Sequence, residues 1–157
     1  MRRTLALVCA SLAFLLLAAC NSAKSFEGRW HLDCEHTTMP SGFSVKAESY
    51  MEIEMKGDGM DMRDYLVSPE TGKFPFPDRH YTLDGKEHVA ESDGLSTLYI
   101  SARIEGSTLY TTERIVHTDP DNPEPESRLA ITYKLSRFGG TLVGTDEQGK
   151  IVTYDRE

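Results

Sequence analysis

The strongest restriction on the fold of this sequence is a series of short runs in which apolar and polar residues alternate, separated by Gly, Asp, Asn and Pro. Residues 129–135 are typical, because Leu129, Ile131 and Tyr133 alternate with polar or small neighbours. A β-strand sends successive side chains to opposite faces, so such a run places one row in a core and the other in water. After residue 20 no run has the 3.6-residue spacing of an amphipathic helix. The pattern predicts an all-β domain.

Turn signals between the runs predict how the strands connect. Gly57-Asp58-Gly59 and Asp84-Gly85 are typical of tight hairpins, the second joining residues 80–83 to 86–90. Residues 68–78 and residues 119–126 are rich in proline and predict loops. The order of runs, without crossover helices, favours an antiparallel up-and-down barrel of about 8 to 9 strands, closed so that no sheet edge stays exposed. The interior of a barrel of this size is either filled by side chains or holds one small ligand. The alternating pattern does not distinguish between these two possibilities.

The first 19 residues are typical of a secretory signal peptide. Two arginines precede an apolar run over residues 5–19, which is shorter than the ~20 residues of a spanning helix. Residues 17–20, Leu-Ala-Ala-Cys, resemble the bacterial lipobox. That resemblance implies cleavage before Cys20 and acylation of its thiol and amino group. The alternative is an ordinary soluble leader that ends in a cysteine by chance.

These features divide the chain into a signal peptide (1–19), a lipidated N-terminus and tether (20–26) and a barrel domain (27–157). Asn21 rather than Asp after the lipidated cysteine implies, by the same resemblance, an outer-membrane anchor facing the periplasm. The leader carries two of the 17 basic and none of the 25 acidic residues, so the remainder has 15 basic residues and a net charge of −10. Such acidity argues against nucleic acid or an anionic lipid surface as partner. The alternative interpretation is that the acidic residues only keep the protein soluble.

Several segments resemble a known family. Gly28-Arg29-Trp30 is similar to the Gly-x-Trp signature on the first strand of lipocalins, where the Trp closes one end of the barrel. The resemblance extends to the lipocalin-like domains of uncharacterised exported bacterial proteins. It implies a barrel with an apolar pocket and supplies no catalytic residues. The chain departs from the family at residues 119–126 and around Cys34. The further segments that carry the resemblance are residues 81–87, 98–104, 133–136, 140–142, 144–150 and 154–156.

The leading functional hypothesis is a lipid-anchored protein that binds a small apolar or amphipathic molecule in the mouth of its barrel. The apolar residues of the alternating runs are candidates for closing or lining the pocket, and they are core candidates as well. The pocket candidates are Trp30, Leu98, Ile100, Ile131 and Tyr133.

Cys34 stands alone once Cys9 leaves with the leader and Cys20 is acylated. A single thiol in an oxidising compartment is buried and inert, cross-linked or a ligand, and burial is the expectation. If residues 30–35 form a strand, Cys34 and His36 point inward as a pair of metal ligands. A closed zinc site needs four ligands, and no second cluster is spaced to complete it.

Four methionines lie on two strands that a tight turn joins. Soft thioethers suit Cu(I), so Met51, Met55, Met60 and Met62 are candidate Cu(I) ligands, with Met39 as a further one. The alternative is that they fill irregular space in the core.

No catalytic motif or cofactor-binding motif stands out, so we expect a binding protein without a cofactor rather than an enzyme. The second hypothesis is a protein-interaction or inhibitor module that presents one of the two proline-rich loops to a basic partner. Cu(I) handling is the third.

Overall fold

The computed structural model describes residues 23–38, 47–119, 122 and 124–157. They form a single antiparallel sheet of eleven strands, which confirms the all-β antiparallel prediction and exceeds the expected number of strands. The strands are β1 (Gly28–Leu32), β2 (Glu48–Lys56), β3 (Gly59–Ser68), β4 (Gly72–Pro75), β5 (Arg79–Thr82), β6 (His88–Ser92), β7 (Ser96–Glu105), β8 (Thr108–His117), β9 (Glu126–Leu135), β10 (Thr141–Asp146) and β11 (Ile151–Arg156).

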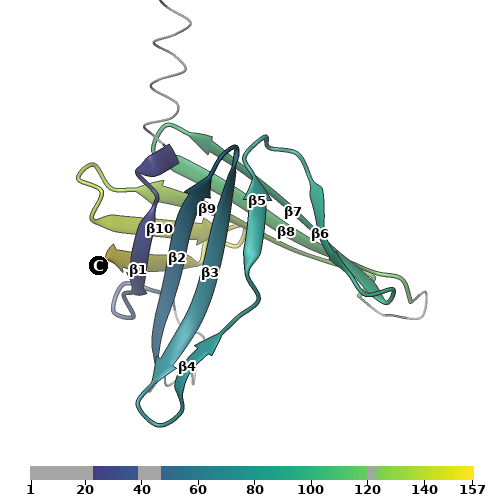
Figure 1. Ribbon diagram of the computed structural model, residues 1–157, viewed down its shortest axis with the longest axis horizontal. Coiled ribbons are helices and arrows are strands. Elements are labelled where there is room, and N and C mark those ends of the chain that lie inside the picture. Colours follow the sequence, from purple (N-terminus) through teal and green to yellow (C-terminus); the bar gives the residue numbers. More distant parts are fainter. Residues whose placement is uncertain (1–22, 39–46, 120–121, 123) are drawn as a thin grey trace, which may run out of the picture.

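The sheet runs in the order β4-β3-β2-β1-β11-β10-β9-β8-β7-β6, with β5 paired to β3 beside β4. Neighbours in the sheet are therefore neighbours in the chain, with two exceptions. β5 pairs with β3, and β1 also pairs with β11, which brings the two ends of the domain together. Figure 1 shows the sheet curled on itself, with β2 and β3 on one side and β9 and β10 on the other. The up-and-down order is that of the predicted barrel.

The predicted hairpin at Asp84-Gly85 is wrong. The turn is present, since Gly85 has a positive φ of 74°, but its amide donates to the carbonyl of Ala102. β5 pairs with β3, and β6 pairs with β7, so the two strands that flank this turn are not paired with each other. Among the described residues the sheet therefore keeps open edges, at β4 and β5 on one side and at β6 on the other, and the expected full closure does not occur.

Two further predictions need correction at the level of single strands. Residues 72–75, predicted as part of a loop, form β4 against β3. Pro75 is tolerated there because β4 is an edge strand and needs no donor on its outer side. The first strand ends at Leu32 rather than at residue 35. Asp33 instead accepts hydrogen bonds from the backbone amides of Glu35 and His36 in a turn.

One end of the barrel is filled by a hydrophobic core around Trp30, which has no exposed surface. The Trp30 indole donates to the carbonyl of Phe26, and the guanidinium of Arg156 lies 4.2 Å from the Trp30 ring. Arg156 also donates to three backbone carbonyls, including that of Gly139 at 2.7 Å. Trp30 therefore closes this end, as the lipocalin resemblance implies. The buried core residues are Phe26, Trp30, Met51, Ile53, Met60, Met62, Tyr81, Ile100, Ala102, Leu109, Tyr133 and Leu142.

At the other end the strands separate from this core. Leu129, at the start of the inward row of β9, is 47% exposed, whereas Tyr133 four residues later is buried. Figure 1 shows the hairpin of β7 and β8, together with β6, extending away from β1, β2 and β3 at this end. The barrel is thus packed at one end and hollow at the other, and the hollow end contains the candidate site.

Candidate functional site

Two adjoining hollows occupy the open half of the barrel. Their volumes are about 360 Å³ and 290 Å³, and both are walled by Leu129, Ile131, Tyr133 and Tyr154. The larger hollow is completed by Ser49, Asp64, Phe76, Arg79 and Glu113, and the smaller one by Thr37, Thr38, Asp146, Lys150, Ile151 and Val152.

The polar residues of the larger hollow come from inward rows that begin as apolar core. On β3 the inward row runs Met60, Met62, Asp64, and the first two belong to the core. Arg79 precedes Tyr81 by two residues on β5, so the two share a face. Glu113 extends the row of Leu109 on β8. Each strand therefore changes from apolar to charged as it passes from the packed end to the hollow end.

Arg79 and Glu113 form an ion pair that faces the larger hollow. Arg79 Nε lies 2.5 Å from Glu113 Oε1, although it lacks the alignment of a hydrogen bond, and the Tyr81 hydroxyl donates to the same oxygen at 2.8 Å. Burial works against the positive charge of Arg79, but the Glu113 carboxylate outweighs it and the pKa of Arg79 is raised. The charge of Arg79 is therefore neutralised within the protein.

Asp64 stands beside this pair without a partner of its own. Among the described residues its carboxyl accepts no hydrogen bond and forms no ion pair, while Arg79 pairs in register with Met62, two residues before it on β3. Burial raises the pKa of Asp64, which Arg79 partly offsets. Asp64 is thus a carboxyl that faces the hollow and that the protein leaves unsatisfied.

Tyr133 and Tyr154 line the same hollow as these charged groups. Burial raises the pKa of both phenols, so both remain protonated at neutral pH and present neutral hydroxyls. With Leu129 and Ile131 they give the cavity an apolar side next to a charged patch. The arrangement suits a molecule that has an apolar body and one polar group.

The structure divides the predicted pocket residues into two groups. Ile131 and Tyr133 line both interior hollows. Leu98 lines a separate hollow of about 190 Å³ between β6, β7 and β8. Trp30 and Ile100, with 0% and 2% exposure, lie in the packed core and contact neither interior hollow.

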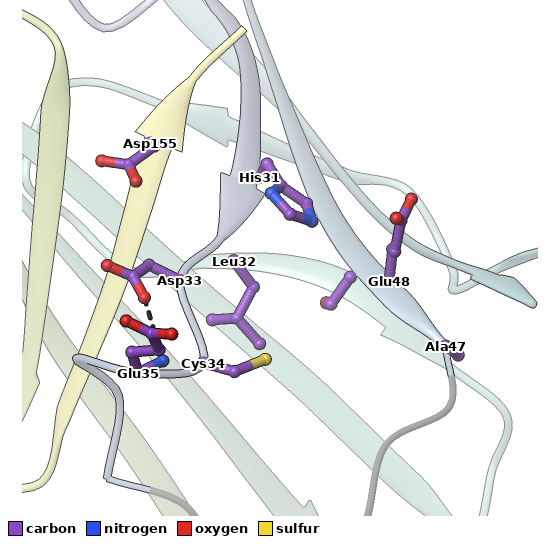
Figure 2. Close-up of a pocket in the computed structure, with 9 residues that line it drawn as sticks. His31, Leu32, Asp33, Cys34, Glu35, Ala47, Glu48 and Asp155 are labelled. Carbon is purple, nitrogen blue, oxygen red and sulfur yellow. Dashed lines mark hydrogen bonds between the residues drawn. The ribbon is translucent and has the colours of Figure 1, made fainter.

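Cys34 is exposed, so the expectation that it is buried is wrong. The predicted inward pair of Cys34 and His36 is also absent, because the strand ends before them. The His36 ring bonds to Asp33, which raises the pKa of His36. Figure 2 shows Cys34 beside an outer hollow of about 390 Å³ at the ends of β1 and β2, where carboxylates including Glu48 gather. Residues 39–46 lie outside the described part of the chain.

The methionines proposed for Cu(I) lie in the packed half. Met51 and Met60 have no exposed surface, Met62 is 4% exposed, and Met55 packs against the core. Within the described residues no group of three or more His, Cys, Asp or Glu side chains is arranged to hold a metal. Met39 and Cys20 lie outside the described residues.

No protein-family model matches the sequence, and no curated protein does. Solved structures do match the fold. Lipid binding protein 8 of Caenorhabditis elegans is 15% identical, with a TM-score of 0.56 over 85% of this chain and 96% of that one. A fatty acid binding protein of Schistosoma mansoni, in complex with arachidonic acid, is 18% identical, with a TM-score of 0.52 over 87% of this chain and 98% of that one.

The chain has the fold of the fatty-acid-binding and lipocalin-like barrels. A variant of the fluorescent protein UnaG shares it too, at 15% identity and a TM-score of 0.55 over 85% of this chain and 97% of that one. At identities this low the likeness establishes architecture, and the function must be argued from the site.

Within the part of the chain that the structure describes, no helical segment has both the length and the hydropathy that a membrane span requires.

Sequence reasoning missed Asp64, Arg79 and Glu113. They lie on three different strands, and each strand contributes only one of them, so no local motif marks the group. One signal was available: in the alternation of residues 60–67, Asp64 falls on the same face as Met60 and Met62. A charged residue on an otherwise apolar inward row indicates a cavity, because a filled core would exclude it.

Proposed function

We propose that this protein binds a small apolar or amphipathic molecule in the open half of its barrel. The observation that carries the proposal is the pair of adjoining hollows that share Leu129, Ile131, Tyr133 and Tyr154 as a wall. The larger hollow, at about 360 Å³, falls in the size range of small-molecule sites. Structures of the same fold include a fatty acid binding protein in complex with arachidonic acid and a fatty acid transporter, which supports a small amphipathic molecule as the ligand.

The second part of the proposal is that the protein is a carrier anchored to a membrane, and not an enzyme. It takes Cys20 as the acylated N-terminus and residues 20–26 as the tether, with the barrel held at the outer membrane on its periplasmic face. The lipobox-like residues 17–20 support this part. Each methylene of an acyl chain buried in the bilayer contributes about 0.8 kcal/mol, so two or three chains would hold the protein permanently.

Ligand binding can be tested by fluorescence with residues 20–157 carrying Cys20→Ser, which lacks the leader and the acylation site. We expect an environment-sensitive apolar fluorophore to bind saturably to this protein. Ile131→Trp should reduce the affinity for the fluorophore at least about tenfold, because Ile131 lines both hollows and the larger indole ring would occupy part of their space.

The matched control is Leu98→Trp, since Leu98 is also partly buried but lines the separate hollow. This variant should bind the fluorophore like the parent protein. Absence of saturable binding, or equal affinity in all three proteins, would contradict the proposed site. Mass spectrometry of intact protein from cells that process lipoproteins tests the anchor, which fails if Cys20 carries no acyl mass.

A further inference from the structure

We infer that the cavity selects ligands whose polar group is a protonated amine, and that Asp64 is the residue that receives it. The inference rests on the proposed function and adds the chemical class of the head group. It follows from three observations: which charges face the larger hollow, how they are paired, and which wall is left for an apolar chain.

The charges that face the larger hollow sum to an excess of one carboxylate. β3 contributes Asp64, β5 contributes Arg79 and β8 contributes Glu113, while β9 and β11 contribute the neutral phenols Tyr133 and Tyr154. Ser49 of β2 adds a hydroxyl, and Leu129, Ile131 and Phe76 add apolar surface. Asp146 and Lys150, of opposite charge, line only the smaller hollow.

Two of the three guanidinium nitrogens of Arg79 already face partners within the protein. Its Nε lies 2.5 Å from Glu113 Oε1, and its Nη1 donates to the carbonyl of Pro77 at 2.8 Å. A ligand carboxylate at Arg79 would compete with Glu113, which also accepts the Tyr81 hydroxyl bond, and would lie in the same hollow as Asp64. Three carboxylates around one guanidinium in a partly buried site repel one another, and the cost is greatest where water is scarce.

A cationic head group meets the opposite situation. The Asp64 carboxyl faces the hollow without a hydrogen-bond donor among the described residues, and an ammonium offers three donors together with the missing charge. The aromatic faces of Tyr133 and Tyr154, in the same hollow, are compatible with a cation. The apolar body would then lie along Leu129 and Ile131, toward the smaller hollow.

A competition assay with three straight-chain ligands of equal length tests this inference: dodecylammonium, dodecanol and dodecanoate. Each displaces the apolar fluorophore from residues 20–157 carrying Cys20→Ser at neutral pH. We expect dodecylammonium to bind about tenfold or more tightly than dodecanol, the usual effect of one hydrogen bond to a charged group. Dodecanoate should bind most weakly. Asp64→Asn keeps the size of the side chain and should abolish the advantage of the ammonium over the alcohol.

The control for non-specific attraction to an acidic protein is Glu105→Gln. It removes the same charge at the β7–β8 turn, where Glu105 pairs with Arg103 and lines neither interior hollow. This variant should keep the full preference for the ammonium. The inference would be overturned if dodecanoate bound as tightly as dodecylammonium or more tightly. It would also be overturned if Asp64→Asn kept the preference for dodecylammonium over dodecanol. Either result would leave the binding function intact. If no fluorophore binds and none of the three ligands competes, both the inference and the proposed function fail.

Discussion

The two halves of this barrel are built from the same strands but serve different purposes. In the packed half the inward rows carry residues such as Trp30, Met60 and Leu142, all with 0% exposure. In the hollow half the inward rows of β3 and β8 carry Asp64 and Glu113, beside open space. The difference shows that the type of inward residue, changing along one strand, separates the region that stabilises the fold from the region that can hold a ligand.

The largest expected effect of a single substitution lies at Trp30 in the packed half. Trp30→Ala removes a fully buried indole, its hydrogen bond to Phe26 and its contact with the Arg156 guanidinium. We expect a loss of about 3–5 kcal/mol in the free energy of unfolding, measured by urea denaturation. A loss under about 1 kcal/mol would mean that this half is not the stabilising one.

Leucines on neighbouring strands allow a direct comparison of the two halves. Leu142→Ala, in the packed half, should cost about 2–5 kcal/mol of stability, because Leu142 has no exposed surface. Leu129→Ala, at the mouth, should cost less than about 1 kcal/mol because Leu129 is 47% exposed, yet it should weaken fluorophore binding. Denaturation and binding measured on both variants test the division, and equal stability losses would break it.

Two aspartates on opposite faces of β3 sharpen the comparison through pH. Hydrogen bonds from Lys56 and His80 lower the pKa of Asp61 below its ordinary 3.8, so its ionised form stabilises the fold above that pH. Burial raises the pKa of Asp64 above 3.8, so the ionisation of Asp64 costs stability once the pH exceeds its folded-state pKa. At neutral pH, Asp61→Asn should therefore lose about 1 kcal/mol, and Asp64→Asn should gain stability.

Both differences from the parent protein should shrink as the pH falls. Below 3.8 the unfolded chain holds both protons, and the Asp61 contribution is lost as the pH passes through its lowered pKa. The Asp64 cost disappears between its raised pKa and 3.8. Thermal unfolding of both variants across this pH range measures the effects, and a loss of stability in Asp64→Asn at neutral pH would contradict the account of Asp64.

The smallest effect is expected at Cys34, outside both halves. Because its side chain is exposed, Cys34→Ser should change the free energy of unfolding by less than about 0.5 kcal/mol. In the native protein the thiol should react with a water-soluble maleimide as fast as in the unfolded chain. Strong protection of the thiol in the native state would show that this turn is covered.

The sequence predicted the regular strands well, because alternation records burial directly. The alternating run over residues 129–135 predicts a strand, and it lies within β9. The pairing of β5 and β6 was wrong because Asp84-Gly85 indicates only that the chain turns, not which strand the next segment pairs with. β4 was missed because proline signals a loop unless the strand is at an edge, and edge position is a property of the whole sheet.

Of the residues that line the two interior hollows, sequence reasoning proposed only Ile131 and Tyr133. Ile131 and Tyr133 follow from alternation within one strand, and both line the hollows. The meeting of Arg79 with Glu113 depends on how β5 and β8 face each other across the barrel, which no local pattern contains. For the same reason Ile100, an apolar residue like Ile131, could not be assigned to the packed half in advance, whereas the Gly-x-Trp resemblance implied a closed end at Trp30.

The pairing of β1 with β11 has a consequence for how the molecule folds. Trp30 lies opposite Arg156, so its immediate neighbour across the sheet comes from the strand that appears last in the chain. Contacts between such distant segments form slowly, because a long loop must close first. Until β11 arrives, β1 has one unpaired edge that can pair with another chain. A chain that stops before Ile151 would thus fold around an incomplete seam, and we expect it to aggregate rather than bind.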